Sequence, residues 1–202
     1  MNKPIALLIA PGNAFAKELI AELKIDYEVH VVTRTPRPDL DANSEVILDL
    51  LDPFFESKLQ QHVKPIADQL QLVILAPKFS PKGGLELNPS DLEQSYRINV
   101  TSLLMTLRTV SNVSKCCVIA IGGGYKDQPD SNKIALSSSK AALHNMIIAI
   151  QDECYERGTV LHELIVDGWI DASEIPPLQI VQAVLNLKDL TTPTVVTISS
   201  QT

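Results

Sequence analysis

Side chains suited to chemistry gather between residues 122 and 140. Ser137 and Lys140 have the Ser-x-x-Lys spacing, which places a hydroxyl and an amine on one face of a helix, where the lysine can act as the base for a serine nucleophile. The run Gly122-Gly123-Gly124 is a possible anion cradle, but no Lys-Ser or Lys-Thr follows it at the spacing of a phosphate-binding loop. We interpret the glycine run as a turn and keep the serine–lysine pair as an alternative that active-site serine labelling would test.

The sequence predicts no metal site and no disulfide framework. Its histidines show no metal-ligand spacing and are scattered over the chain, at His30, His62, His144 and His162. Three cysteines cannot pair completely, and Cys116 and Cys117 are adjacent. Both facts are typical of a reducing compartment, so we expect a cytoplasmic protein.

Composition limits the partners that this chain can take. It has 202 residues, of which 45% are apolar and 20% charged, with a net charge of −7, and this is typical of a single globular domain over residues 1–202. Negative charge is repelled by phosphate backbones and by anionic lipid. No apolar run reaches the roughly 18 residues of a spanning helix, and Pro11-Gly12 ends the first run too early for a signal peptide. We therefore expect no nucleic-acid or membrane partner.

Seven short runs rich in β-branched residues are expected to form strands. Most are apolar nearly throughout, as in a parallel sheet covered on both faces; they are residues 5–10, 27–33, 45–49, 72–76, 116–121, 160–166 and 194–199. Apolar residues at helical spacing lie between them, in residues 14–24, 55–70, 90–113, 137–157 and 180–187. This alternation predicts a three-layer, doubly wound α/β fold of the Rossmann type, with a mostly parallel sheet of about seven strands.

Three local signals bear on the helix ends. Pro65 should break or kink the helix expected over residues 55–70. Ser90 and Glu93 have the spacing of a capping box. Gly158 is a suitable C-cap for the helix expected over residues 137–157.

A ligand of such a fold binds at the carboxyl ends of the strands, so the turn after the first strand is informative. Residues 10–16 read Ala-Pro-Gly-Asn-Ala-Phe-Ala. This turn resembles the Thr-Gly-x-x-x-Gly-x-Gly fingerprint of the short-chain dehydrogenase/reductase family, with Ala10, Ala14 and Ala16 at the three glycine positions. Small side chains are kept there, whereas glycine is lost.

Further segments resemble motifs of this family in the same order, from residue 5 to about residue 199. They are Asp49-Leu50-Leu51-Asp52 for the Asp-x-x-Asp beside the adenine, Leu75-Ala76-Pro77 for Asn-Ala-Gly, Asn99 for the catalytic asparagine, Gly123 for the catalytic serine, Leu136 to Lys140 for Tyr-x-x-x-Lys, and Asp167-Gly168 for Pro-Gly. Their common order and spacing support the Rossmann-type fold.

The resemblance implies an oxidoreductase site whose standard acid–base residues are missing. In the family the tyrosine transfers the proton, the serine polarises the carbonyl, the lysine holds the ribose and the asparagine holds a water relay. Here Leu136 and Gly123 stand at the tyrosine and serine positions, whereas Lys140 and Asn99 remain as candidate catalytic residues. Loss of a positioned proton donor typically costs about 10²–10⁴ in rate.

The retained and substitute residues are open to two interpretations. Lys140 would, without a ligand, only pair or cap on its helix, and Asn99 would bond backbone carbonyls where its helix is disturbed. Tyr125 and Ser138 are candidates to replace the lost acid. A loop tyrosine such as Tyr125 without a fixed lysine neighbour is poorly activated.

The resemblance also implies a nicotinamide dinucleotide, and NADP, NAD or no cofactor remain open. Arg34 follows the second strand, where an arginine can meet a 2′-phosphate; otherwise it is a solvated loop residue. Ala14 brings a methyl group to the place where the backbone approaches the pyrophosphate. The candidate cofactor-binding residues are Ala10, Gly12, Asn13, Ala14, Phe15, Arg34, Asp49, Ala76, Pro77, Lys140 and Gly168.

Two functions are compatible with these residues. The preferred one is a protein with degenerate cofactor and catalytic motifs, which binds a dinucleotide or other small molecule weakly or not at all and has a binding, scaffold or redox-neutral role. The alternative is an active NAD(P)-dependent oxidoreductase for a small carbonyl or alcohol, with rearranged acid–base residues. Gly168 is followed closely by Pro176-Pro177, which leaves little room for the family's substrate lid and favours the first.

The resemblance further implies a homodimer. The helix expected from Ser90 carries more apolar residues than one face can bury in its own core: Leu92, Tyr96, Val100, Leu103, Leu104 and Leu107. In the family this helix and the one that carries the lysine form the dimer interface. We therefore expect a dimer through residues 90–113 and 137–157, with a purely intramolecular core as the alternative.

Overall fold

A seven-stranded parallel sheet forms the centre of the molecule. The computed structural model describes residues 3–12, 14–111, 116–170 and 174–200. The strands are β1 Ile5–Ile9, β2 Glu28–Thr33, β3 Ser44–Ile47, β4 Leu70–Leu75, β5 Cys116–Ile121, β6 Thr159–Asp167 and β7 Val195–Ser199. They are ordered β3-β2-β1-β4-β5-β6-β7, and each neighbouring pair is parallel. The predicted doubly wound Rossmann-type fold is confirmed.

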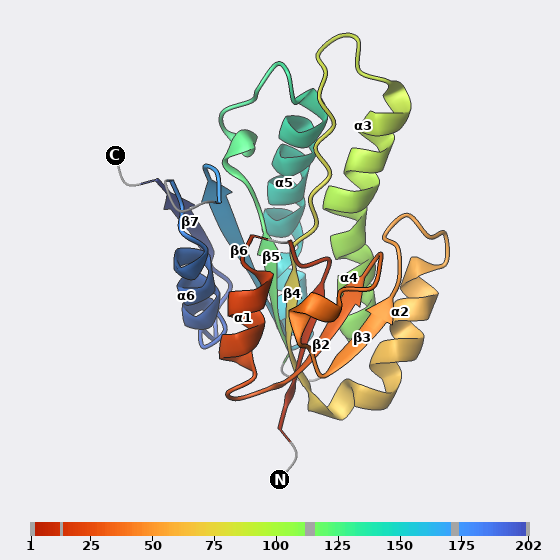
Figure 1. Ribbon diagram of the computed structural model, residues 1–202, viewed down its shortest axis with the longest axis vertical. Helices are drawn as coiled ribbons and strands as arrows, with labels where there is room; N and C mark the ends of the chain where they lie inside the picture. The colour runs from red at the N-terminus through yellow and green to blue at the C-terminus, as the bar shows by residue number, and fades with distance from the viewer. Residues whose placement is uncertain (1–2, 13, 112–115, 171–173, 201–202) are drawn as a thin grey trace.

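Helices cover both faces of this sheet (Figure 1). The helices α1 (Ala16–Leu23) and α6 (Pro177–Leu187) lie on one face, and α2 (Phe55–Val63), α4 (Ser102–Val110) and α5 (Ile134–Glu156) lie on the other. Alternate residues of β1 feed the two cores: Ala6 and Leu8 pack with α1 and α6, whereas Leu7 and Ile9 pack on the opposite face. A strand buried on both faces must be apolar throughout, which is how β1 reads.

Two of the predicted helix ends are confirmed and one is wrong. The helix α2 ends at Val63, and a 3₁₀ segment, Lys64–Gln69, contains Pro65. Gly158 follows α5 with a φ of +85°, a left-handed conformation that suits glycine. The capping box at Ser90 is wrong, because α3 (Pro89–Tyr96) begins one residue earlier and Asn88 Oδ1 accepts from Ser90 N at 3.0 Å. Proline is favoured at the first helical position, where its missing N–H costs no hydrogen bond.

The helix expected over residues 90–113 is interrupted by a π-helical turn. This turn, Arg97–Thr101, lies between α3 and α4, and residues 112 and 113 lie outside the described part of the chain. Such turns widen the hydrogen-bond ring of a helix and often occur near functional sites. Two further 3₁₀ segments, Pro38–Leu40 and Gly124–Lys126, follow β2 and β5.

Two loops rise beyond the carboxyl edge of the sheet, between β4 and α3 and between β5 and α5 (Figure 1). A backbone hydrogen bond from Gly83 N to Asn132 O at 2.8 Å and a bridge between Gly83 and Lys133 join them. On the other side of the same edge, residues 168–170 follow β6 and residues 174–176 precede α6. These loops surround the end of the sheet at which parallel-sheet proteins place their ligands. Among the described residues, no helix has both the length and the apolar character needed to cross a membrane.

Candidate functional site

Two adjoining cavities open at the carboxyl ends of the strands. The first has a volume of about 430 Å³ and lies over β1, β2 and β4. The second, of about 360 Å³, lies over β4, β5 and β6. Gly12, Ala76, Pro77 and Lys78 line both, so the two cavities are halves of one cleft across the point where the strand order reverses.

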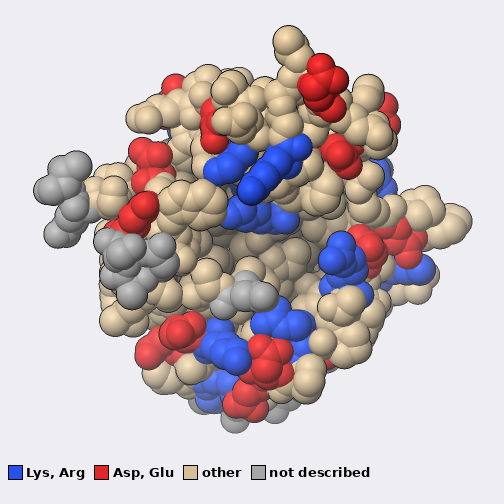
Figure 2. Space-filling view, turned by 45° about the horizontal axis from the view of Figure 1, so that its top comes forward, with Lys and Arg blue, Asp and Glu red and all other residues tan. Residues whose placement is uncertain are grey.

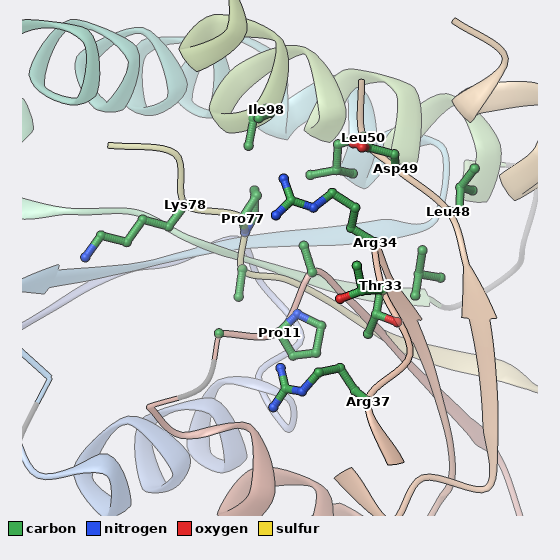
Figure 3. A pocket seen from close by; sticks show the side chains of 15 residues that line it. Pro11, Thr33, Arg34, Arg37, Leu48, Asp49, Leu50, Pro77, Lys78 and Ile98 are labelled. Atoms are coloured by element: carbon green, nitrogen blue, oxygen red, sulfur yellow. The ribbon is translucent and has the colours of Figure 1, made fainter. Parts of the chain in front are cut away.

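The first cavity contains one arginine that is paired and one that is not. Arg37 binds Asp39 through two hydrogen bonds, Nε to Oδ1 at 2.8 Å and Nη2 to Oδ2 at 3.0 Å. These bonds hold the pKa of the Asp39 carboxyl well below its usual range. Arg34, in contrast, extends across the cavity toward Pro77 (Figure 3), and no residue in the described ranges forms a hydrogen bond or an ion pair with it.

The loop that presents these arginines is fixed by a carboxylate on β3. Glu45 Oε1 accepts from Thr33 Oγ1 at 2.7 Å and from the Arg37 backbone N–H at 2.8 Å. On the next loop Asp49 Oδ1 accepts from Leu51 N at 2.9 Å, a local turn that positions this carboxylate at the cavity wall. The rim of the first cavity is therefore formed by polar groups that hold its backbone in place.

The turn between β1 and α1 forms the floor of the cleft. Ala10 has a φ of +50°, a conformation that favours glycine, and its N–H is bonded to Val32 O at 2.9 Å. A Cβ added at Gly12 would meet nothing within 4 Å, so this turn leaves open space. Phe15 precedes α1 and provides no side-chain cap, which leaves the first N–H groups of the helix available to an anion. Asn13 lies outside the described residues.

The second cavity has an apolar wall at the position where the sequence resemblance places a catalytic acid. Leu136 and Gly123, which stand at the tyrosine and serine positions of the resemblance, both line it. Lys140 also lines it, but its Nζ donates to the Ile121 carbonyl at 2.9 Å. Burial lowers the pKa of Lys140 to about 8; the charge of Glu163 opposes this effect and that of Lys78 adds to it.

A buried carboxylate lies behind Lys140. Glu163 is fully buried on β6, and its Oε2 bonds His144 Nδ1 at 2.6 Å. Burial raises the pKa of this carboxyl, against the effect of His144. A Cβ on Gly122 would lie 2.5 Å from Glu163 Oε1, so the first glycine of the run is required by packing against this side chain.

Asn99 and Ser138 are directed away from both cavities. Asn99 is fully buried, and its Nδ2 donates to Phe79 O at 3.1 Å and to Ser95 Oγ and Ser139 Oγ, both at 3.0 Å, while its Oδ1 accepts from Phe79 N at 3.2 Å. Ser138 Oγ donates to Ile134 O at 2.7 Å within its own helix. For Asn99 the geometry matches the structural interpretation, because the amide fastens the π-helical turn to the loop after β4.

The serine–lysine alternative gains no support from the geometry. Ser137 Oγ accepts from Asp130 N at 3.0 Å, and Lys140 Nζ is directed to Ile121 O. No hydrogen bond joins Ser137 to Lys140 in the described part of the chain. Within the described ranges, the histidines, cysteines and carboxylates form no group of three or more that could hold a metal ion.

The expectation that Tyr125 lacks a fixed lysine neighbour is wrong. Lys133 Nζ donates to Tyr125 Oη at 2.6 Å and lies 4.9 Å from the ring centroid. The same nitrogen lies 4.4 Å from the centroid of Trp169, and Lys78 Nζ lies 5.1 Å from it. Sequence reasoning missed Lys78, Lys133 and Glu163, because no spacing in the sequence indicates contacts made across separate loops and strands.

The structure brings the candidate cofactor residues together. Every one of them within the described ranges lines at least one of the two cavities: Ala10, Gly12, Ala14, Phe15, Arg34, Asp49, Ala76, Pro77, Lys140 and Gly168. Residues from six separate segments thus converge on one cleft, which is the arrangement that an extended ligand requires.

No protein-family model and no curated protein matches this sequence. Solved structures, however, match almost the whole chain. A short chain dehydrogenase from Mycobacterium smegmatis has a TM-score of 0.84 at 13% identity, over 100% of this chain and 93% of that chain. An oxidoreductase of the short chain dehydrogenase/reductase family from Brucella ovis, in complex with a partially ordered NAD, has a TM-score of 0.81 at 14% identity, over 98% of this chain and 100% of that chain.

A third structure, the RhlG/NADP active-site complex of Pseudomonas aeruginosa, has a TM-score of 0.80 at 17% identity, over 98% of this chain and 95% of that chain. At such low identity the likeness concerns the fold. Together with the strand order and the position of the cleft, it shows that this chain has the fold of the short-chain dehydrogenases/reductases.

Proposed function

We propose that this chain binds a nicotinamide dinucleotide, NADP in preference to NAD, and does not perform the usual acid–base step of carbonyl reduction. The observation that carries the proposal is the contrast within one cleft: an unpaired arginine in the first cavity, and Leu136 with Gly123 in the second. The chain would then act as a binding, scaffold or redox-neutral protein.

The first cavity fits the adenosine end of such a ligand. Arg34 would meet the 2′-phosphate, because an unpaired guanidinium presents a planar set of donors that suits phosphate. Asp49 at the wall would face the adenine side. The uncapped start of α1 would face the pyrophosphate, where helix N–H groups and the helix dipole favour negative charge.

The second cavity would receive the nicotinamide end but offers no proton donor at the standard position. When bound, the dinucleotide supplies hydride chemistry. Leu136 carries no ionisable group, Gly123 carries no hydroxyl, and the Lys140 ammonium is engaged with the Ile121 carbonyl. These side chains can enclose a ring and exclude water, but they do not protonate a developing alkoxide.

Calorimetric titration of the purified chain with NADPH and NADH tests this proposal. We expect tighter binding of NADPH, and an Arg34→Gln variant that loses about tenfold or more in NADPH affinity while NADH is unaffected. Arg157→Gln is a matched control, since Arg157 is an exposed arginine paired with Glu153 at the far end of α5. Equal affinities for the two nucleotides, or no binding of either, would contradict the proposal.

A second candidate function is favoured by the pair of Tyr125 and Lys133. The phenol of Tyr125 lies at the wall of the second cavity and is held by a hydrogen bond from the Lys133 ammonium at 2.6 Å, so it is positioned to act as a general acid toward a bound carbonyl. The chain would then be an active NAD(P)-dependent oxidoreductase for a small carbonyl or alcohol. NADPH consumption with a panel of aldehydes and ketones, lost in Tyr125→Phe but kept in the exposed Tyr155→Phe, would favour this candidate over the first.

We also propose a homodimer through α4 and α5. Leu104 on α4 and Ile148 and Tyr155 on α5 are 42%, 46% and 49% exposed, which is high for large apolar side chains on two helices. Sedimentation velocity should give a dimer, and Leu104→Arg combined with Ile148→Arg should give a folded monomer. A monomeric wild type would disprove this interface.

We propose a cytoplasmic location because the three cysteines form no disulfide. Cys116, Cys117 and Cys154 are free thiols, and burial raises the pKa of Cys117 to about 12. Buried protonated thiols are unreactive packing groups, which suits a compartment where disulfides do not form.

A further inference from the structure

Four side chains from separate segments meet at the edge of the second cavity. Trp169 follows β6, Lys78 follows β4, Lys133 immediately precedes α5 and Tyr125 follows β5. The two ammonium nitrogens lie 5.1 and 4.4 Å from the Trp169 ring centroid, and one of them also donates to the phenol oxygen at 2.6 Å. The contacts that hold this group together are therefore cation–π contacts and one hydrogen bond.

The charged side chains that line the second cavity, among the described residues, are all lysines. Lys78 and Lys140 line the second cavity, and no carboxylate within the described ranges does so. Four acidic groups lie nearby without lining the cavity. Asp130 Oδ2 lies 3.8 Å from Lys133 Nζ, and Glu174 Oε2 accepts from the Trp169 backbone N–H at 2.7 Å. The buried Glu163 acts on Lys140 through its charge, and the Asp167 carboxylate lies against Gly124. Viewed from this side, Lys and Arg side chains lie on opposite sides of a hollow (Figure 2).

The rest of the cavity wall is apolar. Phe15, Ile121, Leu136, Val166 and Ile170 line it. Such a wall disfavours a bare inorganic anion, whose whole surface needs polar partners. A cavity with cations at one edge and an apolar wall opposite fits a molecule that carries its negative charge at one end.

We propose that the second cavity binds a small organic acid, with its carboxylate between Lys133, Tyr125 and Trp169 and its apolar body against Leu136 and Val166. This assignment rests on the proposed function, because it treats the second cavity as the substrate end of a nucleotide-binding cleft. It goes further by naming the class of molecule that the cleft takes beside the nucleotide.

Lys133 is the residue that distinguishes this carboxylate subsite from nucleotide binding. Lys78 lines both cavities, so a dinucleotide phosphate can also engage it. Lys133 contacts Tyr125 and Trp169 on the side of the second cavity, and its side chain is only 16% exposed. A partly buried ammonium that gains a carboxylate forms a stronger hydrogen bond than an exposed one.

The test uses two probes of nearly the same shape, 3-phenylpropanoate and 3-phenylpropanamide. Their binding to the full chain is measured by ligand-observed NMR titration, with and without 2′,5′-ADP. We expect the carboxylate to bind more tightly than the amide, and Lys133→Gln to weaken the carboxylate about tenfold while the amide is unchanged. Lys133→Arg keeps the charge and should retain most of the affinity, and Lys64→Gln removes an exposed charge on a distant segment and should change nothing.

Equal affinities for acid and amide, or a Lys133→Gln variant that binds the acid like the wild type, would overturn the proposal. The nucleotide is scored separately on the same samples. Carboxylate binding that depends on Lys133 without any binding of 2′,5′-ADP would support the subsite and contradict the proposed function. Binding of 2′,5′-ADP with no preference for the acid over the amide would support the proposed function and contradict the carboxylate subsite.

Discussion

The two cavities of the cleft differ in what they can do. The first contains an unpaired guanidinium and a fixed carboxylate, two groups suited to binding a polar ligand. The second contains Leu136 and Gly123 at the positions that resemble the acid and the hydroxyl of the short-chain dehydrogenases/reductases, and it has lysines at its edge instead. Under the proposed function, the groups of the first cavity serve nucleotide binding, and the second cavity lacks the standard groups for proton transfer.

Packing does not explain the missing hydroxyl of the second cavity, although it does explain the two glycines beside that position. Gly122 and Gly124 are required, because a Cβ at either would collide with the carboxylates of Glu163 and Asp167. Gly123 is different, since a Cβ there would lie 3.6 Å from Lys140 Cγ, an ordinary contact. The backbone therefore tolerates a serine at this position, and the absence of the hydroxyl is a property of the sequence and not of the fold.

Restoring the lost groups is expected to give the largest effect. The double variant Gly123→Ser with Leu136→Tyr supplies a hydroxyl and a phenol to the second cavity near Lys140, and we expect a gain of about 10²-fold or more in NADPH-dependent reduction of an aldehyde that carries a carboxylate. Gly123→Ala with Leu136→Phe fills the same space without the oxygen atoms and should show no gain. Retained NADPH binding with no gain in the first variant would mean that the two cavities do not form one catalytic cleft.

Lys140 provides a pH-dependent test of the second cavity. Burial lowers its pKa to about 8 from an ordinary value of 10.5, so between these values the folded chain has released a proton that the unfolded chain still holds. The contribution of Lys140 to stability therefore rises with pH across this window and is lost as the pH falls through 8. Relative to Lys140→Met, the free energy of unfolding of the wild type should rise by about 3 kcal/mol from pH 8 to pH 10.5. Urea denaturation measures the free energy of unfolding of both proteins at each pH. If the difference between wild type and Lys140→Met does not change with pH, Lys140 is not desolvated.

Substitution of Asn99 distinguishes a structural role of this residue from a catalytic one. Replacement by alanine removes hydrogen bonds to both backbone groups of Phe79, which are partly buried, so the free energy of unfolding should fall by about 2 kcal/mol. The affinity for NADPH should change little, because Asn99 lines neither cavity. The exposed Asn186→Ala is the control for loss of an asparagine. If stability is unchanged and nucleotide binding is weaker in Asn99→Ala, Asn99 has a binding role and the structural role is contradicted.

Most of the architecture could be predicted from the sequence because it depends on local patterns. Each of the seven strands lies where a β-branched apolar run predicts it, and Pro65 ends α2 through its fixed ring and missing N–H. The capping box failed because two neighbouring residues compete for the same role, and Asn88 followed by Pro89 is the better helix start.

The charged groups of the second cavity could not be predicted in this way. Glu163 lies within an apolar run and gives no sign that it faces His144 and Lys140. Lys133 reaches Trp169 because a backbone hydrogen bond between two loops, Gly83 to Asn132, fixes its position. Such contacts join segments far apart in the sequence, so their positions follow from the tertiary structure. The first cavity was more predictable, because Arg34 and Asp49 follow directly on the strands β2 and β3.

The most direct test of the account compares 2′,5′-ADP with 5′-ADP by calorimetric titration, because these probes occupy only the adenosine end of the cleft. We predict that 2′,5′-ADP binds at least about tenfold more tightly, and that Arg34→Gln removes this difference. Equal affinities in the wild type, or a preference that survives in Arg34→Gln, would contradict the claim that the first cavity is a binding site for a 2′-phosphorylated nucleotide.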